Sequence, residues 1–185
     1  MKAGVLALQG DFREHARMFA EAGGTPVLVR TPEELDSVDC LAIPGGESTT
    51  IGRLARRFDL VKPIRERARE GMPLFGTCAG MIVMAHEVRG GEPLLGVMDI
   101  GVDRNAYGRQ VDSFEADVLV AGVGPVRGVF IRAPQVNRVG AGVDVLAEHE
   151  GTPVVVRQGS LLAASFHPEI AADPRLHAYL LKMAS

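Results

Sequence analysis

The stretch Leu74-Phe75-Gly76-Thr77-Cys78-Ala79-Gly80 joins a short apolar run to a segment, residues 79–88, that has the pattern of a helix. A strand followed directly by a helix is the repeating unit of a parallel α/β sheet. Glycine on both sides of a cysteine removes the side chains that would clash in a sharp turn. The stretch therefore predicts a parallel sheet with a cysteine held in a strained strand-to-helix turn.

Short apolar runs alternate with helical patterns on both sides of this stretch, which predicts the α/β class. In the first half we expect strands at 5–8, 26–29, 40–43 and 74–75, and helices at 12–22, 51–58, 63–70 and 79–88. A further helix is expected to begin at a capping box at 31–34. In the second half we expect strands at 100–103, 114–120, 126–131, 143–149, 154–158 and 161–166, and a last helix at 174–183. The pattern predicts one domain over residues 1–185, a three-layer sandwich whose mostly parallel sheet has helices on both faces.

Three loops leave the carboxyl ends of predicted strands in the first half of the chain. They contain Gln9-Gly10, residues 44–50 and residues 76–80. Carboxyl ends of parallel strands lie at one edge of a sheet, where ligands of open α/β sheets bind. We therefore expect all three loops to meet at one edge and to form the site.

Composition excludes several classes of function. The chain has 20 basic and 23 acidic residues, a net charge of −3, so nothing offsets a phosphate backbone and nucleic acid is not expected as a partner. The apolar run at the N-terminus is too short for a signal peptide, and no apolar stretch reaches the roughly 18 to 20 residues that span a bilayer. We expect a cytoplasmic protein without a membrane partner, in which Cys40 and Cys78 form no disulfide.

Cys78 is the candidate nucleophile. The start of the helix that follows it offers free N–H groups and a positive dipole end, which favour a thiolate and a developing oxyanion. The five residues 76–80 alone leave open a buried structural cysteine. Cys40 lies inside an apolar strand without adjacent glycine, and we expect no catalytic role for it.

A cysteine nucleophile needs a base, and four of the five histidines are poor candidates for it. His15 and His177 lie in helical patterns and are expected to be partly exposed. His86 is eight residues beyond Cys78 on the predicted helix, about two turns away, so it cannot reach the thiol. His149 lies between two glutamates in what we expect to be a solvated strand end.

His167 differs because it follows the apolar strand predicted at 161–166, again at a carboxyl end. Pro168 favours extended backbone at His167, and in extended backbone residues two apart point to the same side. His167 and Glu169 should therefore project together, so that the carboxylate orients the ring while the other ring nitrogen faces Cys78. His-Pro-Glu alone could be a chance sequence in a surface loop, but a cysteine turn at the same edge argues against that.

The sequence resembles the class I, or triad, glutamine amidotransferases. The cysteine turn and His167-Pro168-Glu169 carry that resemblance. Further segments resemble the family of glutaminase subunits of pyridoxal 5′-phosphate synthase over nearly the whole chain: Leu8-Gln9-Gly10, Pro44-Gly45-Gly46-Glu47-Ser48-Thr49-Thr50, residues 104–114 and Gly128-Val129-Phe130-Ile131-Arg132-Ala133-Pro134. Tyr107, where Phe is common, is a minor departure. The resemblance implies a flavodoxin-like sandwich, with neither a cofactor nor a metal.

Roles for individual residues follow from the resemblance. Cys78 would attack the side-chain amide of L-glutamine, His167 would transfer protons, and Glu169 would orient His167. Backbone N–H groups of Gly46 and Ala79 would form the oxyanion hole, and Gln9 would couple partner docking to its formation. Glutamine would be held by Gly46, Glu47, Ser48, Arg104, Ile131 and Arg132.

The resemblance also implies a partner. It would be a separate, barrel-shaped synthase subunit in a large hetero-oligomer, which takes the ammonia together with ribose 5-phosphate and glyceraldehyde 3-phosphate. Three alternatives stay open: an amidotransferase subunit of another pathway such as histidine biosynthesis, a cysteine or γ-glutamyl peptidase, and a non-catalytic, redox-sensing protein of the DJ-1-like group. Residues 47–50 and 130–134 argue against the first, and an oriented base argues against the last.

Overall fold

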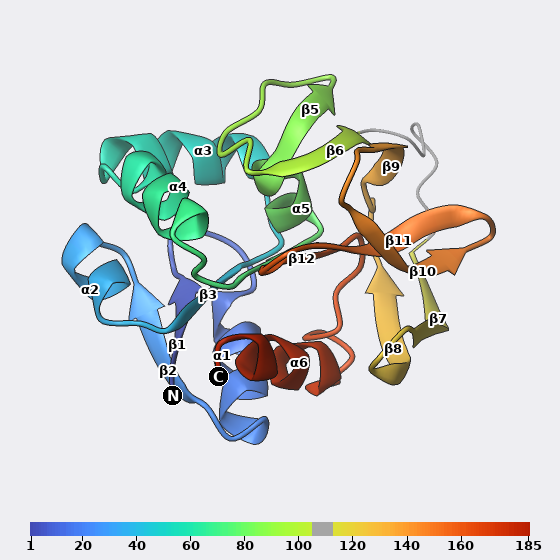
Figure 1. Cartoon of the computed structure of the whole chain (residues 1–185), viewed down its shortest axis with the longest axis horizontal. Helices are drawn as coiled ribbons and strands as arrows, with labels where there is room; N and C mark the ends of the chain where they lie inside the picture. Colours follow the sequence, from blue (N-terminus) through green and yellow to red (C-terminus); the bar gives the residue numbers. More distant parts are fainter. Residues whose placement is uncertain (105–112) are drawn as a thin grey trace.

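A seven-stranded sheet forms the centre of the computed structural model, which describes residues 1–104 and 113–185 (Figure 1). Its strand order is β10-β11-β12-β4-β3-β1-β2. The strands are β1 Lys2–Leu6, β2 Thr25–Val29, β3 Cys40–Ile43, β4 Leu74–Thr77, β10 Asp144–His149, β11 Thr152–Gln158 and β12 Leu161–Ala164. The neighbouring pairs from β2 to β12 are parallel, and β11 and β10 continue the sheet as antiparallel strands. The α/β class with a mostly parallel sheet is confirmed.

Helices cover both faces of this sheet. Helices α1 Phe12–Glu21 and α6 Arg175–Met183 lie on one face, whereas α3 Ser48–Arg57, α4 Val61–Arg69 and α5 Ala79–Met84 lie on the other (Figure 1). Each face has its own apolar cluster, one built around Phe19, Phe75 and Phe166, the other around Leu41, Ile43 and Met81. The three-layer arrangement expected from the alternating pattern is therefore present.

Local sequence explains several element boundaries. The short helix α2, Pro32–Asp36, begins at a capping box in which Thr31 accepts from the Glu34 N–H and the Glu34 carboxylate accepts from the Thr31 N–H. All four residues of β3 are buried, which is why the strand is a continuous apolar run without alternation. Helix α1 ends at Glu21, with Ala22 as its C-cap. Gly23 comes next with φ +87°, a conformation that suits glycine at a helix end.

The helix expected at 79–88 is too long. Helix α5 ends at Met84, and residues Ala85–Arg89 form strand β5, which pairs with β6 Met98–Asp103. The reason is non-local. The N–H groups of Leu95 and Val97 bond to the carbonyls of Val83 and Met84, so these carbonyls are not available to N–H groups of a further helical turn. His86 is therefore on an exposed strand position, not two helical turns from Cys78.

Two small sheets lie outside the main one. Strand β6 lies between β5 and β9, Gln135–Val139, a strand that the sequence patterns did not predict. Strands β7 Phe114–Val120 and β8 Gly124–Phe130 form a two-stranded antiparallel hairpin. In the described part of the chain, no helix is long and apolar enough to cross a bilayer.

Candidate active site

Cys78 lies in a strained turn between β4 and α5. Its backbone has φ +48° and ψ −104°, a conformation that non-glycine residues rarely adopt. The Cys78 N–H bonds to the Ala164 carbonyl at 2.8 Å, which fixes the turn to β12. A side chain at Gly80 would place its Cβ 2.0 Å from the Ile43 carbonyl oxygen, so only glycine fits there. Cys78 is 7% exposed, and its sulfur lies 3.8 Å from the Ile131 carbonyl oxygen.

His167 follows β12, the strand directly beside β4, and this adjacency brings it next to Cys78. Its backbone is tied to β8 by two hydrogen bonds with Val129, of 2.9 and 3.3 Å. His167 is 5% exposed, and its Nδ1 lies 2.7 Å from a carboxylate oxygen of Glu169 and 3.3 Å from one of Asp11. The cysteine turn belongs to the main sheet, whereas the histidine is anchored to the hairpin as well.

Glu169 is fully buried, and its Oε1 lies 2.7 Å from Nδ1 of His167. The sequence predicted this contact, but from extended backbone, whereas Pro168 and Glu169 lie in a turn. Burial alone would raise the pKa of Glu169, but the nearby rings of His15 and His167 outweigh it and lower the pKa. The carboxyl group is therefore ionised and accepts the Nδ1 hydrogen of His167.

The electrostatic setting of His167 favours its charged form. Burial lowers its pKa, but hydrogen bonds to Asp11, Cys78 and Glu169 act in the opposite direction and raise the pKa to about 12. A protonated ring beside the sulfur stabilises a thiolate, which is the reactive form of cysteine. The arrangement can therefore hold a nucleophile and a proton donor at the same place.

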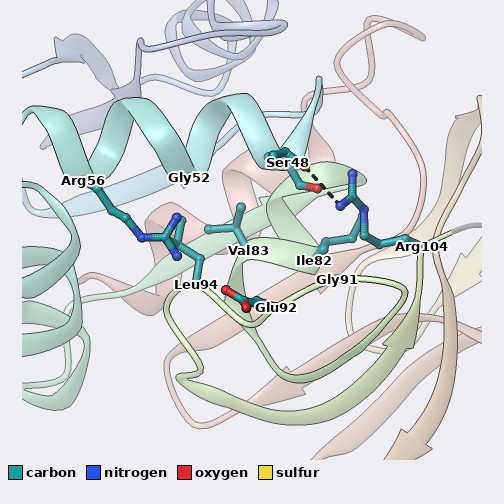
Figure 2. A pocket seen from close by; sticks show the side chains of 10 residues that line it. Ser48, Gly52, Arg56, Ile82, Val83, Gly91, Glu92, Leu94 and Arg104 are labelled. Atoms are coloured by element: carbon teal, nitrogen blue, oxygen red, sulfur yellow. Dashed lines mark hydrogen bonds between the residues drawn. The ribbon is translucent and has the colours of Figure 1, made fainter.

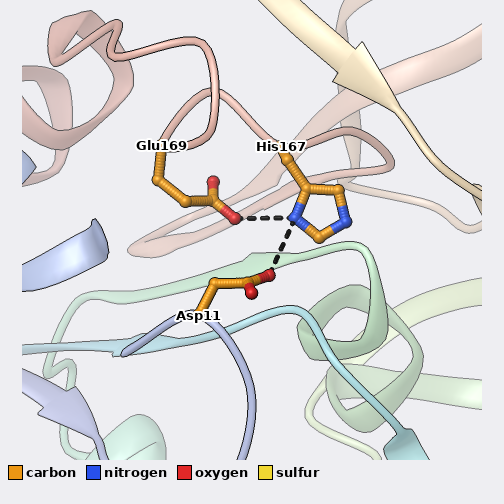
Figure 3. A group of neighbouring side chains, drawn as sticks. All are labelled: Asp11, His167 and Glu169. Carbon is orange, nitrogen blue, oxygen red and sulfur yellow. Dashed lines mark hydrogen bonds and ion pairs between the residues drawn. The ribbon is translucent and has the colours of Figure 1, made fainter. Parts of the chain in front are cut away.

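Asp11 is a neighbour of the histidine that sequence reasoning missed. Its Oδ2 lies 3.3 Å from Nδ1 of His167, so two carboxylates face one ring nitrogen (Figure 3). The available signal was its position directly after Gln9-Gly10, in a loop at the carboxyl end of β1. Asp11, His167 and Glu169 each place one possible ligand atom within 4.8 Å of the other two. A metal ion at Nδ1 would have to displace the hydrogen bonded to Glu169, so we assign the group to proton handling.

A cavity of about 460 Å³ opens beside the sulfur. The predicted site residues that line it are Gly46, Glu47, Ser48, Cys78, Ala79, Arg104, Ile131, Arg132 and His167. Among the described residues, Asp11, Ile82 and Ile170 line it as well. Gln9 lies immediately beside it, because its Oε1 accepts the Glu47 N–H at 2.8 Å. Residues 105–112, most of the family segment that begins at Arg104, lie outside the described residues.

Glu47 and Arg104 form an ion pair inside the cavity. Arg104 donates to Oε1 of Glu47 at 2.9 Å and to Oγ1 of Thr49 at 3.1 Å. The Glu47 carboxylate also caps α3 by accepting from the N–H groups of Thr49 and Thr50. Although burial raises the pKa of Glu47, these hydrogen bonds lower it to about 2.

A second cavity of about 260 Å³ lies next to the first and shares Ser48, Ile82 and Arg104 with it. Figure 2 shows Arg104 reaching towards the start of α3, at the boundary between the two. Arg56 and Glu92, the other charged residues of its described lining, are exposed. Since neither charge is held in a buried position, we assign this cavity no ligand of its own.

His15 and His177 were expected to be partly exposed, and this is wrong: both are 0% exposed. Helices α1 and α6 pack side by side on one face of the sheet (Figure 1), and their two histidines hydrogen-bond to each other at 2.8 Å. A pattern taken one helix at a time does not reveal such a neighbour. The available signal was that His15, Met18 and Phe19 share one helical stripe, which the structure buries entirely.

Gly45→Ala should damage the site more than the fold. A Cβ at this position would lie 2.2 Å from Cε1 of His167 and 2.8 Å from its Nδ1, so the ring must move. A displacement of about 1 Å in a catalytic group costs about 100-fold in rate. We expect kcat/KM for the reaction of this site to fall by that order.

Gly52→Ala is the matched control for that substitution. It lies on α3, and its Cβ would meet its nearest atoms at 3.5 Å, an ordinary contact. Replacing a helical glycine by alanine stabilises by about 1 kcal/mol, so the melting temperature should rise and activity should stay unchanged. Equal activities for the two variants would show that His167 tolerates a side chain at position 45.

A mostly parallel sheet that carries a cysteine turn and a histidine–glutamate pair at one edge defines the class I glutamine amidotransferases. A solved structure described as a glutamine amidotransferase has a TM-score of 0.94 and 54% identity, and the match covers 98% of each chain. The PurLQS structure from Thermotoga maritima has a TM-score of 0.79, with 100% of this chain and 98% of the other covered, and at 16% identity it shows the fold alone. This chain belongs to the SNO glutamine amidotransferase family, whose model matches residues 5–185.

Curated relatives are similar over nearly the full length. A protein of Pelotomaculum thermopropionicum named pyridoxal 5′-phosphate synthase subunit PdxT is 55% identical over 185 residues, which cover 98% of this chain and 94% of the relative. A protein of the same name from Thermus thermophilus is 55% identical over 184 residues, which cover 98% and 96%. These relatives do not favour the histidine-pathway or DJ-1-like alternatives.

Proposed function

We propose that this chain hydrolyses L-glutamine to L-glutamate and ammonia, and that it is the glutaminase subunit of a pyridoxal 5′-phosphate synthase in vitamin B6 biosynthesis. The observation that carries the proposal is that Cys78 and His167 lie together at the wall of one cavity, with the ring of His167 hydrogen-bonded to Glu169. Similarity at 55% identity to proteins named as subunits of that synthase supports the pathway.

The first half of the reaction forms a thioester. The Cys78 thiolate attacks the side-chain amide carbon of glutamine, and the electrons of its C=O bond move to oxygen. As that tetrahedral intermediate collapses, His167 gives its ring proton to the departing nitrogen, so that the C–N bond breaks and ammonia leaves. Glu169 keeps the ring in place through Nδ1 and stabilises its charge.

The second half releases glutamate. Neutral His167 takes a proton from water, and the resulting hydroxide attacks the thioester carbon. Collapse of the second intermediate breaks the C–S bond, and Cys78 leaves as a thiolate beside the protonated ring. The pair returns to its starting state, and one glutamine and one water have become glutamate and ammonia.

Cavity residues supply binding and oxyanion stabilisation. Backbone N–H groups of Gly46 and Ala79, which line the same cavity as Cys78, suit the negative oxygen of both intermediates. The guanidinium groups of Arg104 and Arg132 match the α-carboxylate of glutamine, and Glu47 matches its α-ammonium group. Ser48 and Ile131 complete the glutamine site, and Gln9 links it to partner docking through the Glu47 N–H.

The partner in this proposal is a separate, barrel-shaped synthase subunit in a large hetero-oligomer. Ammonia released into neutral water is mostly protonated and no longer nucleophilic, so direct delivery to an acceptor site is an advantage. The acceptor reaction combines it with ribose 5-phosphate and glyceraldehyde 3-phosphate. Because the nucleophile is a free thiol, we place the complex in the reducing cytoplasm.

Reconstitution with the synthase subunit tests the proposal. We expect this chain alone to release glutamate slowly, and to accelerate when the synthase subunit is added. Pyridoxal 5′-phosphate should then form from the two sugar phosphates with glutamine as the only nitrogen source. Ammonium chloride should replace glutamine plus this chain, which controls for the activity of the synthase itself.

Two outcomes would contradict different parts of the proposal. If glutamate were released but no pyridoxal 5′-phosphate formed, while ammonium chloride still supported the synthase, the pathway assignment would fail. If glutamine were not hydrolysed in the presence of a synthase active with ammonium chloride, the glutaminase assignment itself would fail.

A further inference from the structure

Two buried histidines behind the active site have no part in the reaction described above. His15 on α1 and His177 on α6 are both fully buried, and Nδ1 of His15 lies 2.8 Å from Nε2 of His177. Nε2 of His15 lies 3.0 Å from Oγ1 of Thr77 and 3.4 Å from Oε1 of Glu169. The pair therefore extends from the centre of the apolar layer to the carboxylate that holds His167.

Apolar rings surround the far end of this pair, at His177. The ring of His177 packs edge-on against Phe19 and Phe75, with centroids 4.9 and 5.4 Å away. Polar groups in such a place are costly unless they are hydrogen-bonded to one another. Glu169 is the most demanding of them, since it is a buried carboxylate whose Oε2 has no hydrogen-bond partner among the described residues.

Only one arrangement of hydrogens satisfies the pair. If His15 donated from Nδ1, its bare Nε2 would face the Glu169 oxygen, lone pair against negative charge. His177 would also carry an N–H at Nδ1, an atom with no partner in the described structure. If instead His177 donates from Nε2 to Nδ1 of His15, then His15 carries its hydrogen at Nε2 and turns it towards Thr77 and Glu169. The second arrangement places a donor at each short contact and leaves no buried N–H unpaired.

We propose that His15 is a positioning residue for the reaction: with its tautomer fixed by His177, its Nε2–H keeps Glu169 an ionised carboxylate aimed at Nδ1 of His167. The inference rests on the proposed catalytic roles of Cys78, His167 and Glu169, and it extends them by a further layer of residues. Thr77 shares the same hydrogen from its place beside Cys78, so the turn and the carboxylate are held through one ring.

Several titratable groups face this network. Besides His15 and His177, Glu169 faces His167 on its own loop and Asp11 from the turn before α1. Burial lowers the pKa of His177, so that ring is neutral and serves as a hydrogen-bond donor only. Asp11 is one-third exposed and contacts the same Nδ1, so it can take the His167 hydrogen when Glu169 is displaced.

The rate at which iodoacetamide alkylates Cys78 tests the proposal without glutamine or partner. A thiolate held by a protonated His167 reacts even at about pH 6, whereas at about pH 9.5 a thiol ionises without help. In His15→Leu we expect alkylation at the lower pH to slow about tenfold to 100-fold, the loss expected for one hydrogen bond to a charged group. The rate at the higher pH should stay unchanged. Cys78→Ala gives the blank, because Cys40 is buried and its burial raises the pKa of that thiol to about 12.

Three further variants separate positioning from packing. His15→Gln keeps an N–H donor at the place of Nε2 and should restore the lower-pH rate. His177→Phe keeps the ring but not the hydrogen bond, and it should slow alkylation at the lower pH by a smaller factor than His15→Leu. Met18→Ala removes a fully buried, apolar side chain on α1, and it should lower the melting temperature but keep the wild-type ratio of the two rates.

The ratio of the alkylation rates at the two pH values decides whether His15 positions Glu169. A wild-type ratio in His15→Leu, or a loss equal at both pH values, would overturn the proposal. If His15→Leu does not fold, a wild-type ratio in His177→Phe overturns it by itself. Alkylation does not involve glutamine, so it tests the positioning role separately from the proposed function. If the wild-type protein had no glutaminase activity but His15→Leu still changed the ratio of the two alkylation rates, the proposed function would fail and the positioning of His167 through His15 would stand.

Discussion

Cys78→Ala should abolish glutamine hydrolysis, with a loss of about 10⁴-fold or more measured in the presence of the synthase subunit, because no thioester can form. Alanine keeps the backbone as it is and removes only the sulfur. Glutamine binding, measured by calorimetry, should remain, since the cavity is lined mostly by other residues. Synthesis of pyridoxal 5′-phosphate with ammonium chloride should also remain when this variant is present.

Cys40→Ala is the control for that loss. Cys40 lies in the middle of the main sheet with 0% exposure, and nothing brings it to the cavity. We expect the variant to hydrolyse glutamine at the wild-type rate while it melts at a lower temperature. Wild-type activity in Cys78→Ala would show that Cys78 is not the nucleophile. Loss of activity in Cys40→Ala without loss of fold would contradict the assignment as well.

Glu169→Gln should lower kcat by about 10² to 10⁴-fold and leave KM for glutamine nearly unchanged. The side chain does not line the cavity, but it holds the ring that transfers protons. Without the carboxylate charge the pKa of His167 falls from its raised position of about 12. The ring then loses its proton more easily, so the alkaline limb of the kcat profile should move to lower pH.

The same variant tests the contribution of this carboxylate to stability. The folded-state pKa of Glu169 is lowered, so its ionised form contributes stability above the unfolded-state pKa of about 4.3, and that contribution is lost as the pH falls further. The difference in melting temperature between wild type and Glu169→Gln should therefore shrink below about pH 4. A kcat equal to that of the wild type would remove Glu169 from the reaction.

Local sequence predicted the parts of the molecule that depend on local geometry. Glycine at 76 and 80 predicted the turn at Cys78, and two-residue spacing predicted the contact between His167 and Glu169. Alternating apolar patterns predicted the main sheet, because a strand buried on both faces has no polar residues to interrupt it. Residues of the glutamine site came only from the resemblance, since segments from residue 46 to residue 132 meet in one cavity.

Errors arose where distant segments decide the outcome. The helix after Cys78 stops at Met84 because residues 95–97 take its last carbonyls. His15 and His177 are buried because two helices at opposite ends of the chain pack together. Asp11 reaches His167 only after β1 and β12 enter the same sheet. A pattern within one element contains none of these contacts.

The hydrogen bonds between Val129 and His167 link the chemistry to the two-stranded hairpin of β7 and β8. Among the described residues, β8 pairs along its length with β7 and has one further bridge, from Val129 to His167, whereas the cysteine turn belongs to the seven-stranded sheet. Small units with few partners open at lower free energy than the centre of a protein. On heating, the hairpin should therefore release the histidine before the main sheet melts. Thermal inactivation would then begin at a lower temperature than global unfolding, and preparations that still look folded would already be inactive.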